Sequence, residues 1–251
     1  MRITDVNCMM GTWLERLRQY VSAGELTAVM DQYRLTDCVA YHSTALWSPE
    51  RGNAMMRQIA LESSGQVKAC YVLQPNLGSQ AMPDRDELLK QLQREKPAAV
   101  KLYPKSQRFT VNGFYCGELL ELLDQLALPV LFDADEAPDY VNLPDIARAY
   151  PGIRFVILRQ GANESKYTIP LIKKLDNVFF DTSIMIDTGI IEEIVNRYGS
   201  EKLLFGSGLP FYVPSGALSM IIYARIKDAD RENIFFKNWQ RIEQCHQSPT
   251  A

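Results

Sequence analysis

Short apolar runs alternate with helical patterns along the whole chain, and this alternation restricts the fold more than any other feature. Eight runs resemble β-strands, and each is followed by a polar turn and a segment in which apolar residues recur at helical spacing. The strands are expected at residues 3–8, 37–41, 68–73, 99–103, 129–132, 153–158, 178–181 and 202–205. The helices are expected at residues 25–33, 52–62, 84–95, 118–126, 143–150, 170–175, 190–198, 215–226 and 231–242.

The composition of the strands favours a parallel sheet. Phe155 to Leu158 is apolar throughout, which is typical of a strand buried on both faces. Alternation of strands and helices predicts right-handed crossovers, and eight such units in 251 residues match the size of one (β/α)₈ barrel. An open doubly wound sheet is the alternative, but no glycine-rich dinucleotide loop follows the first strand. The sequence therefore predicts one α/β TIM-barrel domain over residues 1–251, with the barrel at about 3–210 and closing helices at about 215–242.

Charge and hydropathy exclude several classes of partner. The 30 acidic residues against 27 Lys and Arg give a net charge of -3 without a basic stripe, so nucleic-acid binding is not expected. No apolar stretch approaches the roughly 20 residues that cross a bilayer, and Asp5 and Asn7 interrupt the first apolar run, unlike a signal peptide. The five scattered cysteines favour reduced thiols. We expect a cytoplasmic protein without membrane partners, and base rates favour a homodimer.

Four charged residues fall at the carboxyl ends of consecutive strands, where the active site of a TIM barrel lies. Lys101, Asp133, Arg159 and Asp181 alternate in sign around the ring, so they can pair with one another. One interpretation is an ion-pair network that closes the barrel mouth, and the other is a polar pocket for a small anionic ligand. Further candidate site residues at strand ends are Asn7, His42, Tyr103 and Ser207.

Several segments, in this order, resemble the amidohydrolase superfamily, and in particular the amidohydrolase-related metal-dependent hydrolases. They are residues 3–11, 101–104, 128–133, 155–161, 177–183, 204–210 and 232–238, which together span nearly the whole chain. The resemblance implies a barrel hydrolase with a divalent metal at its mouth. Lys101 matches a lysine that part of the family carries on the fourth strand.

This chain departs from the family at each position that the resemblance assigns to a metal ligand. Those positions hold Asn7, Met9, Asp133, Arg159 and Gly208. We hypothesise that Arg159 replaces the charge of the metal and binds Asp133 through two hydrogen bonds. A catalytic zinc site needs about three protein ligands. His42, Asp133 and Asp181 are the alternative set for a displaced site, and otherwise no cofactor is expected. Cys8 should face the helices if Asn7 and Met9 face the barrel interior.

Two classes of function remain open. In the first, a metal-free hydrolase acts on a small carboxylate-bearing lactone, amide or ester, as some metal-free members of the superfamily do with lactones. Asp133 or His42 would activate water, and Arg159 with Lys101 would bind the substrate carboxylate and stabilise the oxyanion. Lys101 would itself act as a base if desolvation lowered its pKa, which pairing with a carboxylate would oppose. Asn7, Tyr103, Asp181 and Ser207 would contact substrate. In the second, a catalytically inactive relative binds a small anionic ligand or a protein partner.

Overall fold

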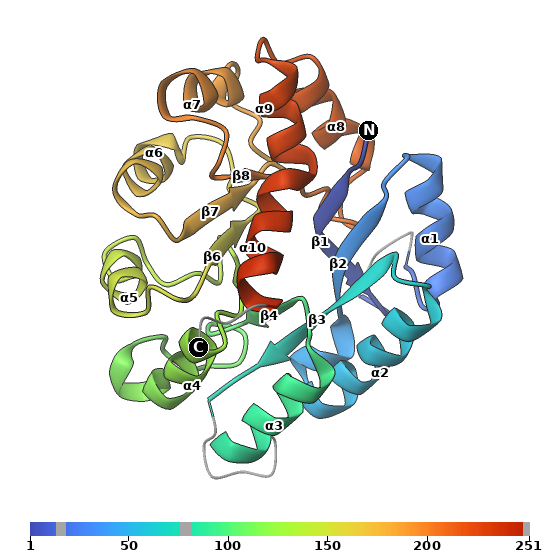
Figure 1. Ribbon diagram of the computed structural model, residues 1–251, viewed down its shortest axis with the longest axis vertical. Coiled ribbons are helices and arrows are strands. Elements are labelled where there is room, and N and C mark those ends of the chain that lie inside the picture. The colour runs from blue at the N-terminus through green and yellow to red at the C-terminus, as the bar shows by residue number, and fades with distance from the viewer. Residues whose placement is uncertain (14–18, 76–81, 248–251) are drawn as a thin grey trace.

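The computed structural model describes residues 1–13, 19–75 and 82–247, and it contains the predicted parallel barrel (Figure 1). Eight strands form one sheet in sequence order, β1 to β8, and each pair of neighbours is parallel. The strands are β1 (Thr4–Met10), β2 (Asp37–His42), β3 (Val67–Leu73), β4 (Ala99–Leu102), β5 (Val130–Asp133), β6 (Phe155–Leu158), β7 (Val178–Asp181) and β8 (Leu203–Leu204). The TIM-barrel prediction is therefore confirmed.

The barrel closes where β8 meets β1. The backbone N–H of Val6 donates to Phe205 O at 3.0 Å, and that of Met9 donates to Leu209 O at 2.9 Å. The N–H of Gly208 donates to Asn7 O at 3.0 Å. These bonds continue the ladder beyond the two residues of β8, so neither β1 nor β8 is left as an open edge.

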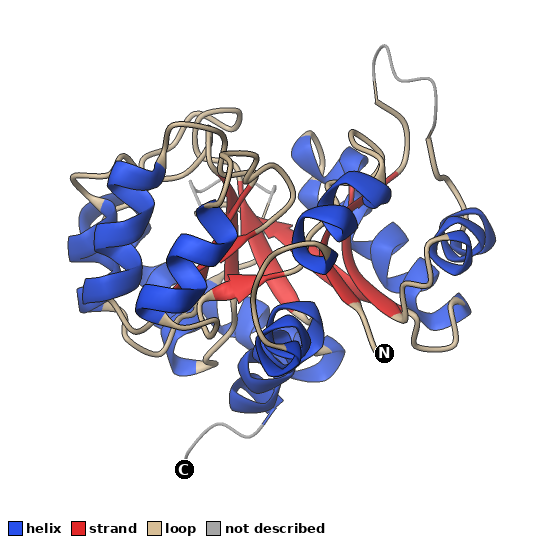
Figure 2. Ribbon diagram, turned by 90° about the horizontal axis from the view of Figure 1, so that it is seen from above, coloured by secondary structure: helices blue, strands red, loops and turns tan. Residues whose placement is uncertain are grey.

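Helices surround the strands in the order expected for repeated β–α units (Figure 2). They are α1 (Ala23–Gln32), α2 (Pro49–Glu62), α3 (Arg85–Glu95), α4 (Gly113–Gln125), α5 (Leu143–Ala149), α6 (Ser165–Lys174), α7 (Ile190–Tyr198), α8 (Pro214–Ile222), α9 (Asp228–Glu232) and α10 (Asn238–Gln247). A short 3₁₀ turn, η1 (Ser43–Leu46), follows β2, and a π-helical turn, η2 (Asn233–Lys237), joins α9 to α10.

Two helices, α4 and α6, begin five residues earlier than the sequence predicts. The side chain of Asn112 caps α4 by accepting from Phe114 N and Tyr115 N, so this helix begins five residues before the expected position. The helix expected from Pro170 is α6, which begins at Ser165 and contains Pro170 in its interior.

The strands separate two packed apolar layers. Alternate residues point outward against the helices or inward along the barrel axis. Cys8 and Met10 belong to the outer layer and Met9 to the inner one, as predicted for Cys8. The inner layer also includes Trp239 and Ile242 of α10. This helix, red in Figure 1, runs across one end of the barrel, and Figure 2 shows loops at the other end.

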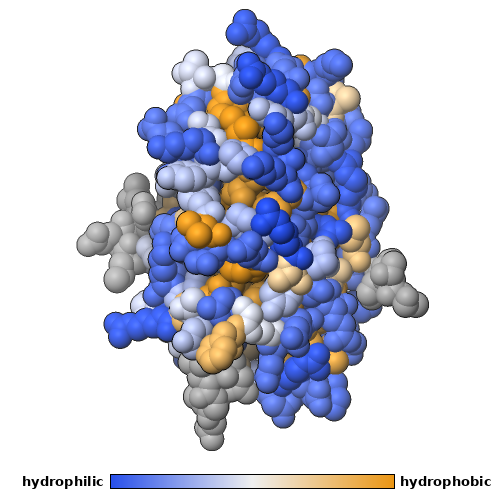
Figure 3. All heavy atoms as spheres, turned by 90° about the vertical axis from the view of Figure 1, so that its left-hand side faces the viewer, coloured by the Kyte–Doolittle hydropathy of each residue, from blue (hydrophilic) through white to orange (hydrophobic). Residues whose placement is uncertain are grey.

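One face of the outer surface is shown in Figure 3, and it is mostly polar. On the face in Figure 3, apolar residues form small separate areas among hydrophilic ones. Within the described residues, no helix is both long and apolar enough to span a bilayer.

Candidate functional site

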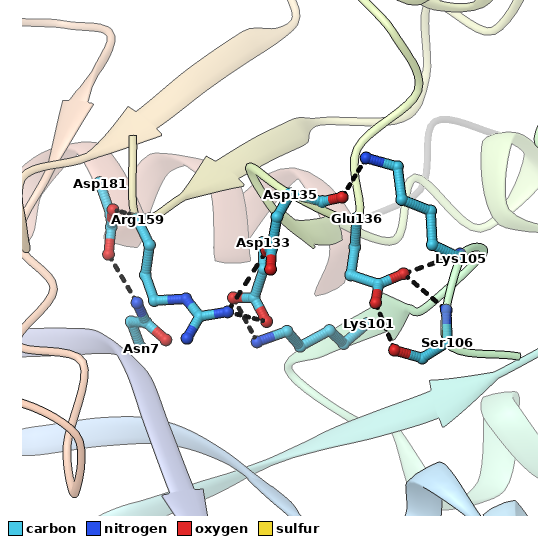
Figure 4. A network of polar contacts seen from close by, with 9 residues as sticks. All are labelled: Asn7, Lys101, Lys105, Ser106, Asp133, Asp135, Glu136, Arg159 and Asp181. Atoms are coloured by element: carbon cyan, nitrogen blue, oxygen red, sulfur yellow. Dashed lines mark hydrogen bonds and ion pairs between the residues drawn. The ribbon is translucent and has the colours of Figure 1, made fainter. Parts of the chain in front are cut away.

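Five strand ends bring the predicted charged residues together at the mouth of the barrel (Figure 4). β4 carries Lys101, β5 ends at Asp133 and β7 ends at Asp181. Arg159 directly follows β6, and Asn7 lies in β1. The sequence predicted this meeting because the carboxyl ends of parallel strands share one edge of the sheet.

Asp133 lies between two cations. Lys101 Nζ is 2.9 Å from Oδ1 and Arg159 Nη2 is 3.0 Å from Oδ2, so each oxygen has its own partner. The side chains of Lys101 and Asp133 are 2% and 4% exposed, whereas that of Arg159 is 23% exposed. Arg159 thus links the buried pair to the opening. The expected pair of hydrogen bonds from the guanidinium to Asp133 is not formed; Nη2 contacts Asp133 Oδ2 and also lies 3.4 Å from Asp135 Oδ1.

Two tyrosine rings enclose the ammonium group of Lys101. Its Nζ lies 4.4 Å from the ring centroid of Tyr41 and 5.1 Å from that of Tyr103. Burial lowers the pKa of Lys101, but the Asp133 carboxylate and Tyr41 outweigh this effect, so the net pKa lies above its ordinary value. The raised pKa favours the charged form of Lys101, which opposes a role as a base. Burial also raises the pKa of Tyr103, whose hydroxyl forms no hydrogen bond with any described residue.

Asp181 is fully buried and has no ion pair among the described residues. Its Oδ1 accepts from the backbone N–H of Arg159 at 2.7 Å, and its Oδ2 accepts from Asn7 Nδ2 at 2.8 Å. Arg159 has a φ of 56°, in the left-handed region, and the bond to Asp181 holds it there. Burial is the main cause that raises the pKa of Asp181 to about 6.

A second buried carboxyl group, Asp5, was not among the predicted site residues. Its Oδ1 accepts from the backbone N–H groups of Asn7 at 3.0 Å and Ser207 at 2.9 Å. Asp5 thus ties β1 to the turn after β8. Ser207, predicted to contact substrate, is fully buried, and its hydroxyl accepts from Leu209 N at 3.1 Å. Its position inside the first apolar run of the sequence was the signal, since a buried charge requires hydrogen-bond partners.

Glu136 was also missed, although it follows β5 within an acidic run. It is 8% exposed. Its carboxylate accepts from Lys105 N at 2.8 Å, from Ser106 N at 3.1 Å and from the Ser106 hydroxyl. It therefore fixes the loop after β4 that begins at Tyr103. Sequence reasoning could not find this role, because the partners lie about 30 residues away in the chain.

His42 does not join this network. It shares the outward-facing side of β2 with Cys38 and Ala40, which pack in the outer apolar layer. Its Nδ1 accepts from Thr44 N at 3.1 Å, and burial lowers the pKa of the imidazole. An alanine Cβ at Gly11 would lie 2.6 Å from its ring, so the histidine packs closely against the residue that follows β1.

Aromatic side chains flank the outer part of Arg159. Its guanidinium carbon lies 5.6 Å from the ring centroid of Phe211, which meets Trp13 edge-on at 5.7 Å. Arg159 Nε and Nη1 form no hydrogen bond with any described residue. These donors are the ones that a carboxylate at the opening would meet.

The residues at this mouth do not fit the divalent metal that the fold family implies. Both oxygens of Asp133 already contact cations, Met9 packs in the inner apolar layer, and Gly208 has no side chain. No group of three or more His, Cys, Asp or Glu in the described ranges is arranged to hold a metal ion. His42 faces away, so the alternative set of His42, Asp133 and Asp181 does not converge either.

Three solved structures illustrate what this fold is similar to. They are 4-oxalomesaconate hydratase from Rhodopseudomonas palustris, 5-carboxyvanillate decarboxylase from Sphingomonas paucimobilis, and dihydroxybenzoic acid decarboxylase from Polaromonas sp. JS666 with bound manganese and 2-nitroresorcinol. Their TM-scores are 0.71, 0.75 and 0.72, and their sequence identities are 14%, 10% and 13%. The alignments cover 98%, 97% and 97% of this chain and 97%, 99% and 97% of theirs, so the likeness extends over the whole barrel.

Sequence comparison places the chain more specifically. No protein of curated function matches it significantly. The amidohydrolase family profile matches residues 77–242, a stretch that includes Lys101, Asp133, Arg159 and Asp181. With the barrel and the order of its elements, this match shows that the chain belongs to the amidohydrolase family.

Proposed function

We propose that this protein is a metal-free, hydrolase-like member of its family that acts on a small carboxylate-bearing lactone, amide or ester. The observation that carries the proposal is the position of Arg159. Its Nη2 contacts buried Asp133, while Nε and Nη1 form no hydrogen bond with any described residue. The guanidinium can therefore bind a substrate carboxylate at the opening. The similar hydratase and decarboxylases are named for reactions of carboxylic acids, which is consistent with this substrate class.

The proposed chemistry begins with an exchange of partners. A substrate carboxylate that binds Arg159 competes with Asp133 Oδ2 for the guanidinium, which leaves this oxygen able to accept a proton. Lys101 keeps its contact with Asp133 Oδ1 and holds the Asp133 carboxylate in place. Asp133 takes a proton from water as the water oxygen attacks the acyl carbon, and it returns this proton to the leaving oxygen or nitrogen. The Tyr103 hydroxyl, which its raised pKa keeps protonated, donates to the oxyanion that forms.

The test uses two esters that differ in charge. The 4-nitrophenyl esters of succinate and butyrate have similar length, but only the first carries a free carboxylate. We expect the wild type to hydrolyse the succinate ester with the higher kcat/KM, and Arg159→Met to remove this preference. Asp133→Asn should lower kcat by about 100-fold or more, since it removes the proton acceptor. Arg148→Met, which removes an exposed arginine on α5, is the control.

Metal dependence is tested on the same protein. We expect elemental mass spectrometry to find no stoichiometric divalent metal, and hydrolysis to survive dialysis against a chelator. Loss of activity with the chelator and recovery with zinc or manganese would contradict the metal-free mechanism.

The second candidate function is binding without turnover. The observation that favours it is the contact of Asp133 with two cations, which leaves neither carboxylate oxygen free before a ligand arrives. Carboxylate binding that requires Arg159, without hydrolysis of either ester, would support this function instead.

A further inference from the structure

When Asp181 is ionised, its carboxylate accepts each of its hydrogen bonds, so the groups around it must donate. A carboxylate can only accept, so Asn7 must turn its Nδ2 toward Asp181 Oδ2. The carbonyl oxygen of this amide then points away from Asp181, on the side where the Arg159 guanidinium lies (Figure 4). With Asp181 ionised, Asn7 therefore presents an acceptor to an arriving ligand, and an acceptor opposes the binding of an anion.

Protonation of Asp181 would reverse this arrangement. A carboxyl group with its proton on Oδ2 becomes a donor there, and it can no longer face an NH₂ group. The Asn7 amide would rotate, accept from Asp181 through its own oxygen, and turn its NH₂ group toward the opening. The other oxygen of Asp181 would still accept from Arg159 N, so the left-handed turn would persist.

We propose that a carboxylate ligand binds at Arg159 together with one proton, which Asp181 takes up while the Asn7 amide turns its NH₂ group toward the ligand. The proposal rests on the proposed function, because it concerns the same anion site. Two effects both strengthen the binding of the carboxylate ligand. Protonation removes a negative charge near the ligand, and rotation adds a hydrogen-bond donor to it.

The packing around Asp181 explains why this residue holds the proton. A Cβ atom on Gly206 would lie 2.3 Å from Asp181 Oδ2, so β7 and the turn after β8 enclose the carboxyl group completely. Burial without a cationic partner raises its pKa to about 6. A proton is thus exchanged at this carboxyl group near neutral pH, at little cost in free energy.

The charged groups that face Asp181 come from two elements. Asp5 on β1 is a buried carboxyl group whose negative charge raises the pKa of Asp181 further. Arg159, after β6, contributes its backbone N–H, and its guanidinium pairs with Asp133 and Asp135 instead. Gly206, in the turn after β8, and Ser183, which follows β7, also meet Asp181 and carry no charge.

The experiment is isothermal titration calorimetry with benzoate between pH 5 and pH 8, a range in which the benzoate carboxyl group is largely ionised. We expect the wild type to bind about tenfold more weakly at pH 8 than at pH 5, within the usual size of coupling between two sites. Titrations in buffers of different ionisation enthalpy should show the uptake of a proton at pH 7.

Asp181→Asn is the decisive variant, because its amide imitates the protonated acid. Its oxygen can accept from Arg159 N and its NH₂ can donate to Asn7, which fixes the binding arrangement. We expect affinity near the wild-type value at pH 5 across the whole range, without proton uptake. Asp187→Asn removes a carboxylate from the loop after β7 and should retain the wild-type pH dependence.

The possible failures differ from one another. If benzoate binds through Arg159 with the same affinity at every pH, or if Asp181→Asn retains the wild-type slope, the proton-coupled mechanism is wrong and the anion site stands. If neither the wild type nor Asp181→Asn binds benzoate at any pH, the anion site itself is wrong and the coupling falls with it.

Discussion

At the scale of single residues, the mouth of this barrel contains buried charged side chains, and contacts with neighbouring residues compensate for the cost of burying them. Asp133 shows this most clearly, since it is buried and neutralised by two cations, one on β4 and one after β6. Asp181 is buried to the same degree without any cation among the described residues. The two aspartates therefore respond differently to substitution and to pH.

Asp133→Asn should destabilise the protein more than Lys101→Met. The first change leaves two cations beside a neutral amide, whereas the second leaves Asp133 with Arg159 as a partner. Breaking a buried pair costs about 3–5 kcal/mol, so we expect this loss in the free energy of unfolding for Asp133→Asn and a smaller loss for Lys101→Met. Urea denaturation followed by far-UV circular dichroism measures both. Equal losses would mean that Arg159 does not neutralise Asp133.

Asp181 should make the folded protein less stable as pH rises from about 4 to 6. Its pKa in the folded state is about 6 against an ordinary value of 3.8, so its stabilising effect is present at low pH and is lost as the group ionises in the folded protein. The shift corresponds to about 3 kcal/mol. Asp181→Asn does not titrate, so its stability relative to the wild type should improve by about this amount between pH 4 and pH 7. Denaturant titrations at both pH values test this, and a constant difference would contradict it.

At the scale of elements, the loop after β4 depends on a residue that follows β5. Glu136, which is largely buried, accepts from two backbone N–H groups, those of Lys105 and Ser106. Glu136→Ala should leave these donors without partners and cost about 1–3 kcal/mol, whereas Glu136→Gln should retain part of the contact. Hydrogen exchange at the two amides should accelerate in the alanine variant. Unchanged exchange there would show that the loop is held by other contacts.

Sequence patterns located the elements better than their ends or their long-range contacts. Apolar runs gave all eight strands, because burial on both faces requires continuous apolar sequence. The predicted start of α6 was wrong, because the helix begins at Ser165 and continues through Pro170. The charged residues were found by their position at strand ends. Glu136 and Asp5 were missed, because their roles come from partners distant in sequence.

At the scale of the whole molecule, the two ends of the barrel differ in composition and in what they contribute. The mouth holds buried charges, and the opposite end is closed by α10, whose Trp239 and Ile242 pack inside the strands. Asn238 anchors the same helix by donating to Ser200 O and Leu203 O, each at 2.7 Å. The apolar packing of α10 at one end stabilises the barrel, whereas the other end contains ion pairs and buried carboxyl groups.

Trp239→Ala should therefore destabilise the entire barrel, not the last helix alone. Trp239 is 2% exposed and packs in the inner apolar layer that all eight strands surround. Removing a buried tryptophan side chain costs about 3–5 kcal/mol, and strands that share one core should lose their structure together. We expect a single transition at lower denaturant concentration, with coincident curves from far-UV circular dichroism and from the fluorescence of the remaining tryptophans. An early, separate loss of helical signal would instead show that α10 unfolds independently and that the strands do not need it.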